Sequence, residues 1–233
     1  YEPNGNVITD PNKGITAFTS NHLNLPVDIT FFQGSIHYDY DALGTKLKKT
    51  VNDNGTITAT EYVFGFQYEK RGNGVNELKF FPHKEGYVKN TNGNYGYIYQ
   101  YKDHLGNVRL SYENVSQTAT PSLQIVEEIN YYPFGLKQKV QGEVINQTQY
   151  KYKYSGKELQ DELGLNLYDF GARNYDPVLG RWLNIDPLAE KGRRWSPYNY
   201  ALNNPVYFID PDGMSPEHDY GIDNSGNITL TRR

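Results

Sequence analysis

Short stretches of alternating side chains, separated by glycine-rich turns, recur along the 233-residue chain. In residues 95–101 every second position is a tyrosine, so these four rings share one face of an extended strand. Residues 150–154 alternate tyrosine with lysine, and residues 56–60 are rich in threonine. Asn-Gly dipeptides tolerate the positive φ angles of tight hairpin turns, and they begin at Asn4, Asn54, Asn73 and Asn92. The pattern predicts a succession of β-hairpins.

A second motif, Asp-x-Leu-Gly, repeats at irregular spacing at residues 41–44, 103–106 and 161–164, with a looser copy at 176–180. In each copy we expect the aspartate to cap the turn, the glycine to be left-handed, and leucine and a preceding tyrosine to pack beneath. An isolated hairpin is only marginally stable. Neighbouring strands must therefore bury the aromatic face, which predicts one continuous antiparallel sheet that winds onwards.

The composition changes after about residue 155, where prolines become frequent. Asp186 and Ser196 are placed to cap short helical turns over residues 187–190 and 197–202, each with proline at the first helical position. A further hairpin signal lies at residues 223–226. We predict an all-β fold, divided into a hairpin segment (1–155), a Pro-rich region containing short helices (156–214) and the start of another unit (215–233).

The composition excludes or disfavours several classes of protein. Aromatic residues make up 15% of the chain, which excludes the aromatic-poor composition of disordered proteins, whereas aliphatic residues are scarce. The chain has no cysteine, and its five histidines are scattered, so we expect no disulfide, metal or cofactor. No long apolar run predicts a membrane span, and a net charge of -4 disfavours binding to nucleic acid. Because the chain begins at Tyr1, we interpret it as a piece of a longer protein.

Two segments near the end of the chain carry a family resemblance. Residues 168–187, YDFGARNYDPVLGRWLNIDP, resemble the signature of the Rhs repeat-associated core domain, and residues 205–214, PVYFIDPDGM, resemble its boundary motif. Residues 103–109 and 131–135 also resemble this family, and the Asp-x-Leu-Gly hairpins resemble its YD repeats. The resemblance extends over residues 38–214.

The resemblance implies a polymorphic-toxin architecture. In this family a spiralling β-sheet forms a hollow shell, and the core domain closes one end as a plug. The sequence beyond the boundary motif is typically a toxin that is held inside the shell. The implied partners are the rest of the shell, the C-terminal toxin domain, a secretion apparatus and immunity proteins. The implied location is secreted or at the surface of a bacterium.

Many members of the family cut their own chain just after the boundary motif by aspartic catalysis. Asp186 matches the family's catalytic aspartate, and Arg173 matches an arginine of the same site. The resemblance therefore implies cleavage between Met214 and Ser215.

One position departs from the family's pattern. In related toxin components a second catalytic aspartate directly follows the arginine, but this chain has Asn174, which cannot share a proton. Either another carboxylate partners Asp186, or cleavage is lost. Asp210, in the boundary motif, is the best substitute, and Asp176 is the next.

Structural interpretations stand beside the catalytic one. Asp186 is also a good helix cap, Asp210 lies in an ordinary Asp-Pro-Asp-Gly turn, and Arg173 and Arg181 could pair with Asp169 or Asp176. At the level of the whole chain, the alternatives are a container without peptidase activity and a cell-surface adhesion module whose tyrosine ladders stack on glycans.

Overall fold

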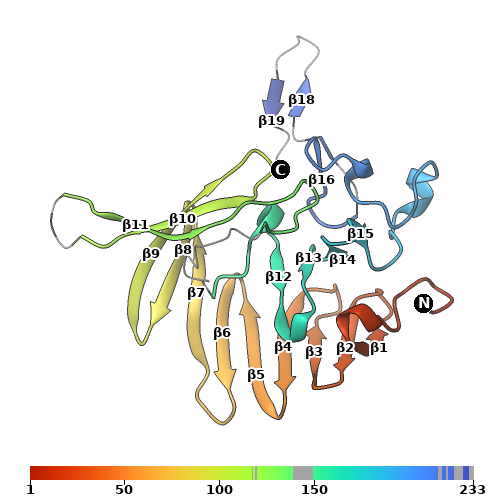
Figure 1. Ribbon diagram of the computed structural model, residues 1–233, viewed down its shortest axis with the longest axis horizontal. Helices are drawn as coiled ribbons and strands as arrows, with labels where there is room; N and C mark the ends of the chain where they lie inside the picture. Colours follow the sequence, from red (N-terminus) through yellow and green to blue (C-terminus); the bar gives the residue numbers. More distant parts are fainter. Residues whose placement is uncertain are drawn as a thin grey trace.

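The computed structural model describes residues 1–116, 118, 120–138, 149–214, 217–218, 220–222 and 228–230. Eleven antiparallel strands pair in chain order and form one twisted sheet (Figure 1). The continuous sheet predicted from the hairpins is therefore confirmed. The strands are β1 (Ile15–Ser20), β2 (Pro26–Phe31), β3 (Gly34–Tyr40), β4 (Lys46–Asp53), β5 (Thr56–Val63), β6 (Phe66–Arg71), β7 (Glu77–His83), β8 (Gly86–Thr91), β9 (Asn94–Lys102), β10 (Val108–Asn114) and β11 (Leu123–Glu128).

The Asn-Gly dipeptides form the predicted hairpin turns at two places. Asn54 and Gly55 connect β4 to β5 with φ angles of 49° and 86°. Asn92 and Gly93 connect β8 to β9 with φ angles of 53° and 86°. Two successive positive φ angles define the turn whose twist matches that of the flanking strands. These two dipeptides therefore set where the hairpins reverse.

The Asp-x-Leu-Gly turns follow the prediction only in part. The Asp41 carboxylate accepts the Leu43 and Thr45 amides at 2.9 and 2.8 Å, and Asp103 caps its own turn in the same way. Asp161 makes no such cap, and its carboxylate binds Lys151 instead. Leucine does not pack beneath the first turn, because Leu43 is 90% exposed at its tip.

The tyrosines of β9 share one face as predicted, but that face is open to solvent. The expectation that it becomes buried is wrong. The opposite face of β9 carries Ile98, which is fully buried and belongs to a cluster with Phe80, Tyr87 and Tyr150. The core therefore lies on the other side of the sheet, where the segment that contains Tyr150 packs.

Residues 150–154 do not form the regular strand that their alternation predicted. The segment makes one isolated bridge, from Tyr152 to Glu158. Lys153, one of its two lysines, is buried and forms an ion pair with Glu127. Burial lowers the pKa of Lys153 to about 8, against the opposing effect of the Glu127 carboxylate.

The C-terminal region forms a smaller, four-stranded antiparallel sheet that packs on the large one (Figure 1). Two further pairs of short strands follow, β16 with β17 and β18 with β19. The turn predicted at residues 223–226 lies outside the described residues. The strands are β12 (Glu158–Gln160), β13 (Leu167–Asp169), β14 (Asn174–Asp176), β15 (Arg181–Trp182), β16 (Phe208–Ile209), β17 (Glu217–His218), β18 (Tyr220–Ile222) and β19 (Ile228–Leu230).

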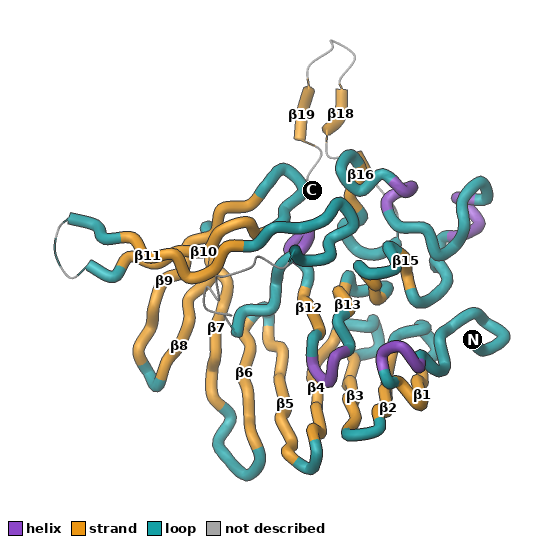
Figure 2. Tube along the Cα trace, in the orientation of Figure 1, coloured by secondary structure: helices purple, strands orange, loops and turns teal. Residues whose placement is uncertain are grey.

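The predicted short helices are 3-10 turns, and they begin later in the sequence than expected. Figure 2 shows these helices in purple, within the loops that connect the strands. The Asp186 carboxylate accepts the Leu188 amide at 2.7 Å, so it caps a turn that precedes the helix. Within the described residues no helix is long and apolar enough to cross a membrane. The helices are η1 (Pro11–Lys13), η2 (Tyr154–Gly156), η3 (Glu162–Gly164), η4 (Ala189–Gly192) and η5 (Ala201–Asn203).

In the described part of the chain, the core is divided into three clusters. One is largely aliphatic and joins β1–β4 to residues of the C-terminal region such as Leu165 and Leu167. A second lies within the C-terminal region and is almost wholly aromatic, with Tyr175, Trp182 and Tyr200 in mutual contact. The third is the cluster around Ile98. The second cluster forms the floor of the site described below.

A buried network of charges fastens the two sheets together. Glu158 of the small sheet accepts hydrogen bonds from Tyr62 at 2.7 Å and from Lys49 at 3.4 Å. Lys46 bridges Glu158 and Asp169, the latter at 2.6 Å. Burial alone would raise the pKa of Glu158, but the ammonium groups of Lys46 and Lys49 lower it to about 2. The carboxylate is therefore ionised at neutral pH and serves as the counter-ion of both lysines.

We expect Glu158→Ala to lower the free energy of unfolding by about 3 kcal/mol, because two buried ammonium groups lose their shared partner. Glu128→Ala, at an exposed position on β11, is the control and should stay within about 0.5 kcal/mol of the wild type. Urea denaturation measures both. Equal midpoints for the two variants would contradict the network's role.

Candidate functional site

The candidate site is built around the buried guanidinium group of Arg173, which lies in the turn between β13 and β14. Its Nη2 contacts Asp186 Oδ2 at 3.0 Å and Asp210 Oδ2 at 3.4 Å. Its Nη1 donates to the carbonyl of Pro197 at 3.3 Å, and its Nε donates to the carbonyl of Gly213. A single arginine thus joins four segments of the C-terminal region.

The ring of Trp182 forms the floor beneath this arginine, with 4.3 Å between the guanidinium carbon and the ring centroid. Burial lowers the pKa of Arg173, whereas the Asp186 and Asp210 carboxylates raise it. A guanidinium group nevertheless remains charged in proteins. The site therefore contains a permanent positive charge in an aromatic environment, where its electrostatic effects are stronger than in water.

The boundary motif folds back as a tight loop against the β13–β14 turn. The Gly213 amide donates to Asp210 Oδ1 at 2.8 Å, and the Ala172 amide donates to the Asp212 carbonyl at 3.0 Å. The ammonium group of Lys157 donates to the carbonyl of Pro211. These bonds fix the backbone immediately before the predicted scissile bond.

Gly213 is required at this position for two reasons. Its φ is 84°, in the left-handed region that favours glycine. A Cβ atom here would lie 3.1 Å from the backbone nitrogen of Arg173. Close approach of the loop to the arginine therefore depends on the missing side chain.

The two carboxylates occupy different environments. The Asp210 side chain is fully buried, and burial raises its pKa, with the Arg173 guanidinium acting in the opposite direction. The Asp186 side chain is 17% exposed. The two acids therefore contact the same nitrogen from sites of unequal exposure to water. Such asymmetry is what general acid–base chemistry by a carboxylate pair requires.

The structure brings together three residues singled out in the sequence, Arg173, Asp186 and Asp210. Met214 lies directly after the loop, but Ser215 lies outside the described residues. Asn174 is buried in β14, adjacent to Arg173 in the chain. Whether these residues catalyse cleavage stays a prediction.

The alternative pairing of Arg173 with Asp169 or Asp176 is wrong. Asp176 contacts Lys13 at 3.1 Å and accepts the Val178 amide at 2.8 Å, so it is occupied away from Arg173. Asp169 pairs with Lys46. Arg173 instead pairs with Asp186 and Asp210, which lie in segments far apart in the sequence.

Sequence reasoning missed Lys157 and the floor formed by Trp182. Lys157 belongs to no motif, and only the folded chain brings it to Pro211. Trp182 lies inside the recognised motif, but its contact with Arg173 depends on the pairing of β14 with β15. Within the described parts of the chain, no group of three potential ligands could hold a metal ion.

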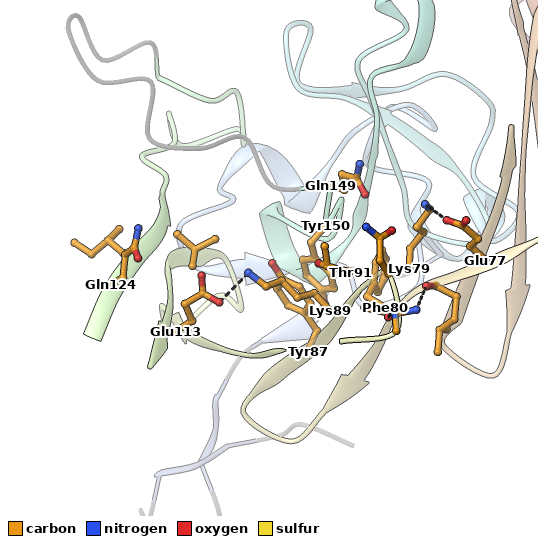
Figure 3. Close-up of a pocket in the computed structure, with 16 residues that line it drawn as sticks. Glu77, Lys79, Phe80, Tyr87, Lys89, Thr91, Glu113, Gln124, Gln149 and Tyr150 are labelled. Atoms are coloured by element: carbon orange, nitrogen blue, oxygen red, sulfur yellow. Dashed lines mark hydrogen bonds and ion pairs between the residues drawn. The ribbon is translucent and has the colours of Figure 1, made fainter. Parts of the chain in front are cut away.

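A separate hollow of about 670 Å³ lies between β7, β8, β10 and β11, next to Gln149 (Figure 3). Its charged residues pair with one another, Lys89 with Glu113 at 2.8 Å and Lys79 with Glu77 at 3.0 Å. On its floor, Tyr87 stacks on Tyr150 at 3.9 Å. Both rings are buried, so this floor offers no open platform for stacking a sugar.

The chain is similar in sequence or in fold to parts of several known proteins. Salivary gland surface protein 1 of Aedes aegypti is 30% identical over 228 residues, 92% of this chain and 6% of that protein. Toxin subunit YenC2 of Yersinia entomophaga is 37% identical over 116 residues, 47% of this chain and 11% of that protein. The crystal structure of TcdB2-TccC3-Cdc42 matches 92% of this chain and 11% of its own, with a TM-score of 0.71 and 23% identity.

No family model matches the chain. The chain spans about a tenth or less of the length of these similar proteins. It is related in sequence to a toxin subunit and has the fold of part of TcdB2-TccC3.

We expect Arg173→Lys to lower the free energy of unfolding by about 3 kcal/mol, because an ammonium group cannot contact both carboxylates and both carbonyls at once. Arg181→Lys, an exposed position on β15, is the matched control and should be nearly neutral. Thermal and urea unfolding measure both. An Arg173→Lys variant as stable as the control would show that the arginine does not hold these segments together.

Proposed function

We propose that this chain is the part of a toxin-enclosing Rhs-type shell that contains its core domain and boundary motif, and that it cuts itself between Met214 and Ser215. The likeness to a toxin subunit and to TcdB2-TccC3 supports the shell role. The proposal includes secretion or display by a bacterium and enclosure of a C-terminal toxin. The observation that carries the peptidase role is the contact of one buried arginine with Asp186, Asp210 and the carbonyl preceding residue 214.

The proposed reaction assigns a different task to each carboxylate. Asp186, the more exposed one, takes a proton from the water that attacks the carbonyl carbon of Met214. In this proposal Asp210 gives a proton to the departing nitrogen of Ser215, and burial, which raises its pKa, favours the protonated form that this step needs. The carbon–oxygen bond forms first, which places negative charge on the carbonyl oxygen, and the carbon–nitrogen bond breaks in the second step. Arg173 stabilises the negative charge that develops between these steps.

Tethering supplies much of the rate. The peptide to be cut is held by Arg173 and Lys157, so no free energy is spent on capturing a separate substrate. In this proposal Asp210 replaces the aspartate that Asn174 lacks. A container without peptidase activity remains the alternative, and Asn174 is the residue that favours it.

We expect the full chain to yield a product that ends at Met214, and both Asp186→Asn and Asp210→Asn to abolish its formation. Each amide keeps the shape of the carboxyl group but cannot accept or donate the required proton. Asp161→Asn, which removes only a carboxylate paired with Lys151, is the control and should cut normally. Intact mass of denatured samples measures all four proteins. An uncut wild type with a cooperative unfolding transition would favour the container.

We expect the cleavage rate to fall as pH rises above the raised pKa of Asp210, because the neutral form of this acid donates the proton. The measurement dilutes the full chain from urea into buffers between about pH 4 and 9 and follows the 1–214 product. A rate that rises steadily with pH would contradict the role of Asp210 as the acid.

A further inference from the structure

An apolar hollow of about 640 Å³ opens beside the boundary loop. Three turns that are far apart in the sequence form its walls, and Met214 lies on one side. Its lining includes the apolar side chains of Leu23, Leu25, Leu43, Phe170, Pro187 and Met214, and the charged Lys46 and Asp169, which pair with each other. Pro187 and Ala172 both line the hollow, and in the chain they directly adjoin Asp186 and Arg173. The hollow therefore lies next to the candidate site.

The position of Leu43 has no explanation in the fold. It is 90% exposed at the tip of a β3–β4 turn, contributes nothing to the core, and yet is a large apolar residue. Leu23, at the neighbouring β1–β2 turn, is 36% exposed, and Met214 is 37% exposed. All three line the same hollow. Exposed apolar residues gathered around one concavity are typical of a binding site.

Hydrogen bonds fix the backbone that leads to residue 214, and the Met214 side chain lies at this hollow. The Met214 amide donates to Asp212 Oδ1 at 2.9 Å, and Asp212 is itself held through the Ala172 amide. Gly44 keeps the facing wall close, because a Cβ atom there would lie 3.0 Å from Leu25 Cδ1. The residue before the predicted scissile bond is thus presented to an apolar surface.

We propose that this hollow is the specificity pocket for the side chain at position 214, and that Leu43 and Leu23 are specificity-determining residues. The inference rests on the proposed self-cleavage and adds which residues can precede the cut. The pocket accepts flexible or branched apolar side chains and rejects polar ones of equal size. The hollow is larger than one methionine side chain, so we expect the size of residue 214 to affect cleavage less than its polarity does.

Substitutions at position 214 test the preference directly. Met214→Leu should cut within about threefold of the wild-type rate, because apolar volume is retained. Met214→Gln has nearly the same length but places an amide in the apolar hollow, and it should cut about 10- to 100-fold more slowly. Equal rates for the glutamine and leucine variants would overturn the proposal.

Leu43→Ser removes a wall of the pocket without touching the core, and it should slow cleavage about tenfold. Leu179→Ser is the matched control, since Leu179 is 63% exposed at the tip of the related turn at residues 176–180. It should cut at the wild-type rate. Because Met214 is the only methionine in the chain, a methyl-labelled sample gives one resonance that reports on the pocket.

The resonance is recorded in the uncut Asp186→Asn background, so the readout is independent of cleavage. Leu43→Ser should shift it, and Leu179→Ser should leave it unchanged. If the wild-type chain cuts itself but Leu43→Ser leaves the resonance unchanged, the pocket alone is overturned. A wild-type chain that stays uncut would overturn the proposed function, and with it any role of the hollow in choosing the cleavage site.

Discussion

The organisation of the C-terminal region depends on one buried charge. A guanidinium group removed from water must find acceptors, because an unpaired buried charge costs several kcal/mol. Arg173 satisfies this requirement with two carboxylates and two backbone carbonyls drawn from three segments. The need to pair this charge draws Asp186, the Pro197 turn and the boundary loop to one point. The proposed chemistry uses the same arrangement.

The large sheet supplies the rigid support for that arrangement. Its core face packs on aliphatic residues of the small sheet, and the ion network at Glu158 adds directional bonds between the sheets. The other face carries the exposed tyrosines of β9. A thin sheet with one packed face and one open face needs few aliphatic residues, in agreement with the composition.

Local chemistry made the hairpins predictable, whereas long-range packing decided the rest. Asn54-Gly55 and Asn92-Gly93 dictate their turns through backbone conformation alone. The open face of β9 was predicted wrongly because alternation marks two faces without saying which one the remaining chain covers. Arg173, Asp186 and Asp210 were found through the resemblance of their motifs. Lys157 and Leu43 were missed because their roles arise from contacts between distant segments.

The central claim is that Asp186 and Asp210 form one electrostatic unit around Arg173. The most direct test is to titrate the Asp210 carboxyl group by carbon-13 NMR in the wild type and in Asp186→Asn, with both chains ending at Met214 so that they differ at position 186 alone. The account predicts an Asp210 pKa above the ordinary aspartate value, and a lower one when Asp186 loses its charge, since the neighbouring carboxylate contributes to the rise. An ordinary pKa that is the same in both proteins would contradict it.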